Sequence, residues 1–419
     1  MDCLKAISVK DASELNGSIV IQGSKNNVLP IMAASLLCEG ITKIYNCPKI
    51  EDVHVMCDLL QCLHVRTEYE DHVLTIDTRY ACCEPLPYEL TCRLWASVLL
   101  LGPMLARWQR AELGMPGGCA IGMRPIDIHL EGLMKMNVDV KLYRNILTCS
   151  TYYLQGTEFT LRFPSVGATQ NLIMAAVGAK GRTILRGVAR EPEIVELCKH
   201  LMCMGVLMEG VGSDVLVIKG TKEISCCDYY NVYDRIVAGT YLLMAAAVPS
   251  RIKLVGIEDV QYIKNIMKVV ALLGVNVVHI DNYLSVESFG TISGGFFETG
   301  FYPDFPTDLQ PVLMAVLAGA AEDSILTETV FEKRFQVVAE LIKLGAEIEV
   351  KGKKAWIKGG CHLQGHTVKA TDLRQGAALV VAGLMSSGYT TITDVSYIER
   401  GYEDIVMDLQ GVGAEIFYI

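Results

Sequence analysis

The amino-acid sequence predicts a mixed α/β protein of two domains, each built from three repeated strand–helix units around buried helices. The chain has 419 residues, more than one ordinary hydrophobic core accommodates. A pattern of short strand, amphipathic helix and alternating strands recurs roughly every 70 residues, which is typical of a repeat architecture. Helices rich in Ala, Leu and Met separate the copies, and a helix that is apolar all round is buried.

The copies can be placed in order along the chain. Five copies are regular, and each has an opening strand, a helix and closing strands, in that order. These elements span residues 40–46, 50–62 and 65–76 in the first copy, 181–185, 191–204 and 206–218 in the third, and 250–255, 259–273 and 275–286 in the fourth. They span residues 323–327, 335–344 and 346–357 in the fifth copy, and 388–393, 402–412 and 414–419 in the sixth. The second copy differs, because a glycine-rich segment separates its strand at 111–113 from its helix at 126–136. An insertion in one copy of a regular array usually carries function.

A second helix lies in each unit before the next copy begins. These helices are expected to form the interior, and they span residues 26–37, 94–105, 168–177, 237–247, 308–317 and 374–384. Six copies divide into three and three, with the join near residues 230–234. The first domain is therefore expected at residues 22–232 and the second at residues 1–21 plus 233–419, with a lead strand at 7–21 that pairs with the second half.

Composition excludes several classes of protein. The net charge of −10 argues against a nucleic-acid partner, although a local basic cluster can still hold an anion. The N-terminus has no signal-peptide pattern and no stretch of eighteen apolar residues occurs, so we expect a cytoplasmic protein without a membrane segment. The 15 cysteines include no Cys-x-x-Cys pair, so we expect neither a zinc site nor a disulfide framework, and most thiols should be reduced and apolar in role.

The glycine-rich segment at residues 114–125 holds Cys119, followed five residues later by Arg124. It matches neither a dinucleotide-binding nor a P-loop fingerprint. An arginine nearby lowers the pKa of a thiol in general, so Cys119 is a candidate acid or nucleophile. A surface loop with an incidental thiol is the alternative.

Further candidates lie at helix starts and turns. Lys25 precedes the first buried helix, where the helix dipole disfavours a cation unless an anion is bound; a solvated Lys is the alternative. Asp308 opens a buried helix, either as an N-cap or as a base. Asp372 and Arg374 are two residues apart, and such neighbours more often form a structural ion pair than a functional site. Arg400 lies in the turn of the sixth copy that corresponds to the glycine-rich segment of the second. Cations, an acid and a thiol at such turns fit a cleft between two domains that holds an anionic substrate.

Seven motifs carry a resemblance to a known family. They are Gly-Ser-Lys-Asn at 23–26, Pro-Gly-Gly-Cys-Ala-Ile-Gly-Met-Arg-Pro-Ile-Asp at 116–127, Pro-Ser-Val-Gly-Ala-Thr at 164–169, Arg-Glu-Pro-Glu-Ile at 190–194, Phe-Pro-Thr-Asp-Leu-Gln at 305–310, Ala-Thr-Asp-Leu-Arg at 370–374 and Arg-Gly-Tyr-Glu at 400–403. With them the whole chain resembles the UDP-N-acetylglucosamine 1-carboxyvinyltransferases. The cysteine loop is the most discriminating motif, because the sister family that makes enolpyruvylshikimate phosphate shares the fold and lacks this loop.

The resemblance implies two inside-out α/β barrel-like domains and an enzyme that needs no metal or cofactor. The reaction would move the enolpyruvyl group of phosphoenolpyruvate to the 3-hydroxyl of UDP-N-acetylglucosamine and release phosphate, the first committed step of peptidoglycan synthesis. Cys119 would protonate the methylene carbon and be the target of fosfomycin, and Asp308 would take the hydroxyl proton. Lys25, Arg124 and Arg400 would hold phosphoenolpyruvate, with Asn26 beside it. The UDP-sugar would contact Arg124, Pro125, Ile126, Asp127, Ile128, Phe163, Pro164, Ser165, Val166, Gly167, Asp308 and Val330, while Asp372 and Arg374 would shape the cleft.

One position departs from the family pattern. The family has Arg-Ala-Ser where this chain has Trp95-Ala96-Ser97, and that arginine contacts the nucleotide sugar. An indole supplies no cation, and Arg93, two residues earlier, is expected to point to a different side of the helix. Two alternatives therefore stay open: a paralogue with a different nucleotide acceptor, and a non-catalytic UDP-sugar-binding regulator. The candidate acid and base argue against the regulator.

Overall fold

The structure is a computed structural model, and it describes residues 6–117 and 125–419. Contacts within the chain group it into two compact units. One unit, called the continuous unit here, comprises described residues from 23 to 232; the other, the discontinuous unit, comprises residues 6–22 and 233–419. Gln22 belongs to the discontinuous unit, because its backbone carbonyl accepts from Asp234 and its side chain bonds to Gly401 and Glu403. No helix in the described ranges is long and apolar enough to cross a membrane.

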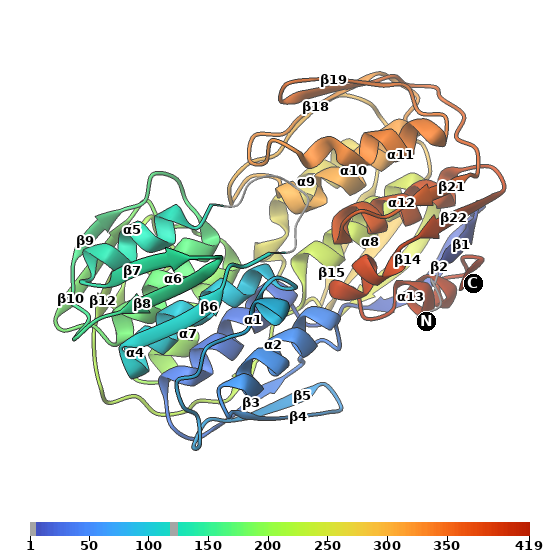
Figure 1. Cartoon of the computed structure of the whole chain (residues 1–419). Coiled ribbons are helices and arrows are strands. Elements are labelled where there is room, and N and C mark those ends of the chain that lie inside the picture. Colours follow the sequence, from blue (N-terminus) through green and yellow to red (C-terminus); the bar gives the residue numbers. More distant parts are fainter. Residues whose placement is uncertain (1–5, 118–124) are drawn as a thin grey trace. The chain divides into compact units, whose positions relative to one another are not determined.

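The continuous unit holds three strand–helix copies and their interior helices (Figure 1). Its interior helices are α1 (Lys25–Ala34), α4 (Leu101–Trp108) and α6 (Val166–Val177). The copies consist of β3 (Ile41–Tyr45), α2 (Glu51–Cys62), β4 (Arg66–Glu70) and β5 (Val73–Asp77); β6 (Arg110–Gly114), α5 (Asp127–Lys135), β7 (Asp139–Tyr143) and β8 (Ile146–Ser150); and β10 (Arg182–Arg186), α7 (Pro192–Cys203), β11 (Leu207–Glu209) and β12 (Val215–Lys219). Short helix α3 (Tyr88–Thr91) and strands β9 (Glu158–Thr160) and β13 (Tyr229–Tyr230) connect them.

The discontinuous unit repeats this plan. Its interior helices are α8 (Arg235–Ala247), α10 (Gln310–Ala318) and α12 (Leu373–Met385). The copies consist of β14 (Pro249–Val255), α9 (Lys264–Leu272), β15 (Asn276–Ile280) and β16 (Tyr283–Phe289); β18 (Ser324–Thr327), α11 (Val338–Lys343), β19 (Ile348–Lys351) and β20 (Lys354–Ile357); and β22 (Tyr389–Thr393), α13 (Ile405–Gly411) and β23 (Ile416–Tyr418). Strands β1 (Ile7–Lys10), β2 (Leu15–Val20), β17 (Phe296–Glu298) and β21 (Thr367–Lys369) complete the sheets.

Five of the six sheets share one strand pattern. In each of these four-stranded sheets, the opening strand of a copy is one of the two inner strands. It pairs in parallel with an edge strand from another segment and antiparallel with the other inner strand, called the middle strand here. In the sixth copy β1 takes that middle place between β22 and β23. The expected pairing of the lead segment with the second half of the chain is therefore confirmed. The single strand expected at residues 7–21 is instead two strands, β1 and β2, which belong to different sheets.

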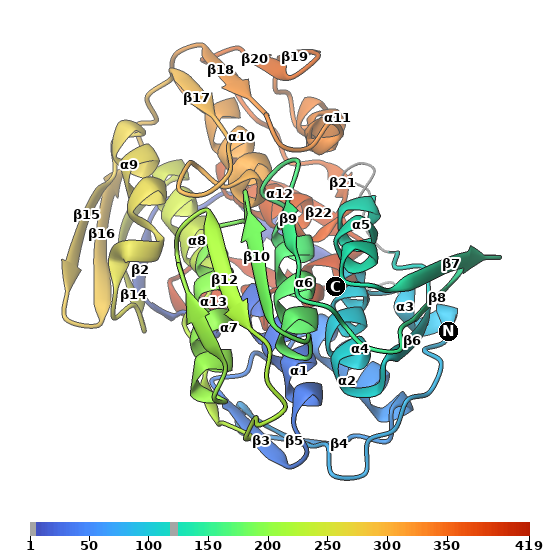
Figure 2. The ribbon, with the colours of Figure 1, turned by 90° about the vertical axis from the view of Figure 1, so that its left-hand side faces the viewer.

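The interior helices are buried on every side, which is why they carry almost no charge. Every residue of α10 and of α12 except Met385 is buried, and the two helices pack against each other. Sheet β15–β16–β14–β2 packs against the interior helix α8 (Figure 2), so the buried helix lies inside and the strands lie outside. The predicted inside-out α/β class is confirmed.

Two expectations about local structure are corrected. The helix expected at residues 94–105 is a 3₁₀ turn at Trp95–Leu100 followed by α4. The cysteines also include one disulfide, Cys203–Cys227, which joins the end of α7 to the segment before β13. Its partners are 24 residues apart, so their proximity depends on how the hairpin β11–β12 folds back and is not visible as a motif.

Candidate active site

In the continuous unit, Lys25 is the first residue of α1 and is almost completely buried. Ser24 caps this helix by accepting from the backbone N–H of Asn27. The Lys25 ammonium lies 2.6 Å from a carboxylate oxygen of Asp52, whose side chain is 3% exposed, in the first turn of α2. A cation at a helix N-terminus is unfavourable on its own, and here Asp52 offsets that cost and fixes the position of the ammonium group. The sequence did not single out Asp52.

Asn26 faces a third helix. Its amide donates to Glu193, 3.4 Å away, in the first turn of α7. The N-terminal turns of α1, α2 and α7 are therefore tied together by Lys25 and Asn26. Exposed donors from such turns attract anions, because the first backbone N–H groups of a helix have no partner within it.

The expected sugar-nucleotide residues lie at the starts of α5 and α6. Asp127 begins α5 and binds Arg162 at 2.5 Å, a hydrogen bond that lowers the pKa of Asp127. Ser165 caps α6, and Phe163 just before it is exposed. Pro164, Val166 and Gly167 are partly exposed around it, and Pro125 is exposed. Ile126 and Ile128, in contrast, are buried in the hydrophobic core, so their side chains serve packing and only their backbone is available to a ligand.

Helices α5 and α6 are also joined by a buried histidine that the sequence analysis missed. The side-chain oxygen of Asn171 accepts from Gly102 N–H at 2.6 Å. The side-chain NH₂ of Asn171 therefore faces the Val98 carbonyl and the Nδ1 atom of His129, which is 3.1 Å away. His129 therefore accepts at Nδ1 and is neutral. Burial lowers its pKa from 6.5 to about 4.

In the discontinuous unit, Asp308 lies in the turn Thr307–Leu309 before α10 and is held by two arginines. One carboxylate oxygen is 2.8 Å from Arg334 and the other is 3.1 Å from Arg374. Both arginine side chains are nearly buried, whereas Asp308 remains 25% exposed. Burial opposes the charge on Arg374, but Asp308, Tyr402 and Asp234 together more than offset it, so the pKa of Arg374 is raised. Two guanidinium groups favour the ionised carboxylate, the form that can accept a proton.

Arg334 was not predicted, and the expected Asp372–Arg374 structural pair is wrong. Asp372 instead caps α12, accepting from the backbone N–H groups of Arg374 and Gln375. The guanidinium of Arg374 reaches Asp308, 66 residues away in sequence. Residues two apart share a face in a strand, but here the chain turns into a helix between them, and this separates their side chains.

Val330 and Arg400 lie in turns whose backbones are held by hydrogen bonds to side chains. The buried carboxylate of Glu328 accepts from Val330 N–H at 2.7 Å and from the Thr307 hydroxyl at 2.9 Å, which ties Val330 to the Asp308 turn. Arg400 ends a 3₁₀ turn. Gln22 bonds to Gly401 and Glu403 just after it.

Cys119 and Arg124 lie outside the described residues. Trp95 is partly buried and packs against the core of the continuous unit. Arg93 lies in the turn before it, not in a helix, and its guanidinium is 2.6 Å from Glu51. Arg93 is thus already engaged by an acid next to Asp52.

The family model described as EPSP synthase (3-phosphoshikimate 1-carboxyvinyltransferase) matches residues 9–409. A protein of Halalkalibacterium halodurans named UDP-N-acetylglucosamine 1-carboxyvinyltransferase 1 is 39% identical, covering 99% of this chain and 94% of its own length. This chain belongs to the UDP-N-acetylglucosamine 1-carboxyvinyltransferase family. A Clostridium tetani member is 40% identical over 99% of the chain and all of its own length, and a Thermotoga maritima member is 40% identical, covering 98% of each.

Solved structures agree with this family assignment at the level of the fold. The enolpyruvyl transferase NikO from Streptomyces tendae matches with a TM-score of 0.91 at 22% identity, covering 99% of both chains. EPSP synthase from Acinetobacter baumannii matches with a TM-score of 0.77 at 16% identity, covering 99% of this chain and 100% of its own. The chain is therefore an enolpyruvyl transferase in fold and family.

Proposed function

We propose that this enzyme transfers the enolpyruvyl group of phosphoenolpyruvate to the 3-hydroxyl of UDP-N-acetylglucosamine and releases phosphate. The observation that carries the proposal is the near full-length identity of about 40% to relatives that bear this activity in their names. The setting of Asp308 supports it, because its carboxylate is partly exposed and two nearly buried arginines hold it in one position, as a positioned base requires.

The chemistry needs one acid and one base. Cys119 delivers a proton to the methylene carbon of phosphoenolpyruvate, and the adjacent carbon becomes oxocarbenium-like. The sugar 3-hydroxyl adds to that carbon while Asp308 takes its proton, which gives a tetrahedral adduct. Loss of a methyl proton and departure of phosphate then restore the double bond in the enolpyruvyl ether. Atoms and charge balance without a redox step.

The remaining predicted residues bind the anions. Lys25, Arg124 and Arg400 are assigned to the carboxylate and phosphate of phosphoenolpyruvate, with Asn26 beside them. Lys25 is the best supported of these, because Asp52 fixes its ammonium at the N-terminus of α1, where backbone N–H groups add to its field. The starts of α5 and α6, from Pro125 and Phe163 onward, are assigned to the sugar nucleotide.

A phosphate-release assay tests the proposal directly. The enzyme is mixed with phosphoenolpyruvate and UDP-N-acetylglucosamine, and Asp308→Asn is compared with Asp323→Asn, an exposed acid at the start of the same repeat. We expect release by the wild type and Asp323→Asn, and a loss of roughly 100-fold or more in kcat for Asp308→Asn. No release with this acceptor, but release with another nucleotide sugar, would contradict the assigned substrate.

A second acceptor is favoured by one observation, the indole at Trp95. With Arg93 bound to Glu51, neither residue presents a free guanidinium in the way the family pattern does. If the enzyme nevertheless uses UDP-N-acetylglucosamine, Trp95→Arg should lower KM for it and leave kcat nearly unchanged. If Trp95→Arg raises KM for every nucleotide sugar tested, the indole itself is part of acceptor recognition.

A further inference from the structure

Each of the six copies has one helix between its strands, here called its outer helix, and all six outer helices end in the same kind of turn. They are α2, α5, α7, α9, α11 and α13. The residue after the C-cap adopts a left-handed backbone and donates to the carbonyl three residues earlier, and the next residue donates to a carbonyl five residues before it. This arrangement is the Schellman motif, in which glycine is favoured and asparagine tolerated. In five helices the left-handed position is occupied accordingly, by Asn137, Gly205, Gly274, Gly345 and Gly413.

The first repeat is the exception, because its left-handed residue is His64, with φ of 59°. His64 N–H donates to Gln61 and Val65 N–H donates to Leu60, as in the other copies, so the backbone geometry is the same. A histidine with a Cβ atom is less stable in this conformation than glycine. The repeat itself therefore does not require a histidine at position 64.

Two further ligand-type side chains meet His64. The N–H of Cys82 donates to the carbonyl of Leu63, which places Cys82 beside the helix end, and Glu84 follows two residues later. The same backbone bond occurs in three other copies, where Gln155, Ser225 and Gln364 stand in place of Cys82. Among the described residues, His64, Cys82 and Glu84 form the one group of at least three potential metal ligands whose ligand atoms all lie close to one another.

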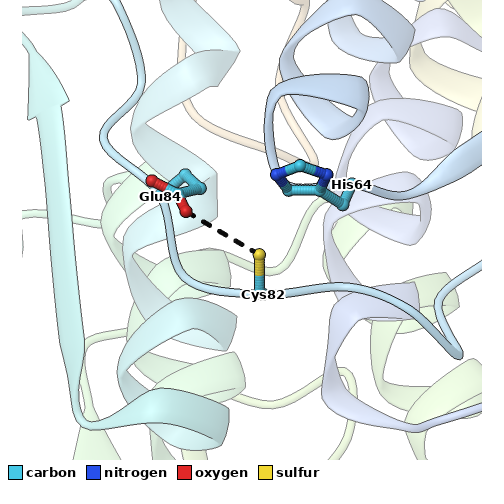
Figure 3. Close-up of side chains that lie close together, drawn as sticks. All are labelled: His64, Cys82 and Glu84. Atoms are coloured by element: carbon cyan, nitrogen blue, oxygen red, sulfur yellow. Dashed lines mark hydrogen bonds between the residues drawn. The ribbon is translucent and has the colours of Figure 1, made fainter.

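The ligand atoms face a common space (Figure 3). The Cys82 sulfur is 3.9 Å from Glu84 Oε1, and one ligand atom from each residue lies within 4.8 Å of the others. In a tetrahedral zinc site with metal–ligand distances of about 2.0–2.3 Å, neighbouring ligand atoms are roughly 3.3–3.8 Å apart. Rotation of partly exposed side chains can supply the remaining approach of about 1 Å.

We propose that His64, Cys82 and Glu84 bind a zinc ion, with water as the fourth ligand. Imidazole nitrogen, thiolate sulfur and carboxylate oxygen are the ligands zinc prefers, and the two negative charges neutralise the ion. Zinc binds the thiolate, so binding displaces the thiol proton that Cys82 donates toward Glu84 and releases it to solvent. The ion would clip the end of α2 to the segment that leads from β5 to α3.

The zinc site is separate from the proposed chemistry. His64 follows the C-terminus of α2, whereas Asp52, the partner of Lys25, lies in its first turn. A helix of 12 residues is roughly 18 Å long, so the two sites are far apart within the same unit. Failure of the enolpyruvyl-transfer assay would therefore leave the zinc proposal intact, and the reverse also holds.

Metal titration of the full-length chain tests the proposal. Protein stripped with a chelator and kept in a phosphine reductant is titrated with Zn²⁺ by calorimetry and with Co²⁺ by absorbance. We expect one ion per chain, a thiolate-to-cobalt charge-transfer band, proton release and an upward shift in Tm with zinc. The other thiols of the chain can also bind zinc weakly, so the variants decide the result.

His64→Gly is the sharpest variant, because glycine suits the left-handed backbone. Metal-free His64→Gly should unfold at the same temperature as the wild type or higher, yet bind zinc roughly 100-fold more weakly or worse. Cys82→Ser should lose the charge-transfer band. Cys83→Ser should keep it, because the Cys83 thiol donates to the Arg110 carbonyl and does not face the site. Equal zinc affinity in His64→Gly, Cys82→Ser and Cys83→Ser would overturn the proposal.

Discussion

The buried ion pair between Lys25 and Asp52 makes a quantitative prediction. Their charged atoms are 2.6 Å apart and the side chains are 11% and 3% exposed. Asp52→Asn removes one charge and leaves the Lys25 ammonium buried without its carboxylate partner. Breaking a buried pair in this way costs about 3–5 kcal/mol. This is a large fraction of the roughly 5–15 kcal/mol by which a folded protein is stable.

The adjacent residue supplies a matched control. Glu51 lies in the same helical turn and its pair with Arg93 has the same 2.6 Å separation, but both side chains are nearly half exposed. An exposed pair contributes about 0.2–1 kcal/mol, because water already solvates both charges. Glu51→Gln should therefore change the free energy of unfolding several times less than Asp52→Asn.

Urea denaturation followed by tryptophan fluorescence measures both variants, since Trp95 and Trp108 report on the continuous unit. The double variant Lys25→Met/Asp52→Leu removes both charges and should regain at least half of the lost stability. It should remain inactive if Lys25 binds phosphoenolpyruvate. A loss for Asp52→Asn no larger than that for Glu51→Gln would refute the reasoning.

Three other outcomes are expected. His129 is buried neutral with a pKa near 4 against 6.5 when unfolded, so its contribution to stability should fall by up to roughly 3 kcal/mol as pH drops from 6.5 to 4, and His129→Gln should make stability depend less steeply on pH there, while His200, whose pKa burial also lowers to about 4, keeps its share. Reduction of Cys203–Cys227 opens a 24-residue loop and should lower the free energy of unfolding by about 3 kcal/mol, whereas an unchanged urea midpoint would count against a stabilising disulfide. Fosfomycin incubated with the enzyme and UDP-sugar should add one adduct mass at Cys119, and Cys119→Asp should show none while retaining transferase activity.

Periodicity was enough to predict the fold. Each outer helix and each interior helix has a pattern that depends on local spacing alone, so their positions follow from the sequence. The 3₁₀ turn at Trp95–Leu100 was missed, because a 3₁₀ turn and an α-helix bury nearly the same apolar residues.

The site was less predictable, because its partners are distant in sequence. Asp308 was found through its motif, but Arg334 carries no local signal and is recognised only when its guanidinium meets that carboxylate. Asp52 was missed for the same reason. His64 and Cys82 escaped attention because zinc motifs are sought at short spacing, whereas here a hairpin brings the two together.

The place of β1 in the last sheet has a consequence for protein synthesis. Strand β1 can pair with β22 and β23 only after both have been synthesised, because Ile7 lies opposite Ile392 and Tyr418. At about 5–20 residues per second, the ribosome needs roughly 20–80 s to make the intervening chain. The continuous unit can fold in that interval, since its two ends already meet where Ser24 N–H donates to the Val232 carbonyl. Until then Ile7 and Val9, which are buried in the finished sheet, belong to a strand with both edges open.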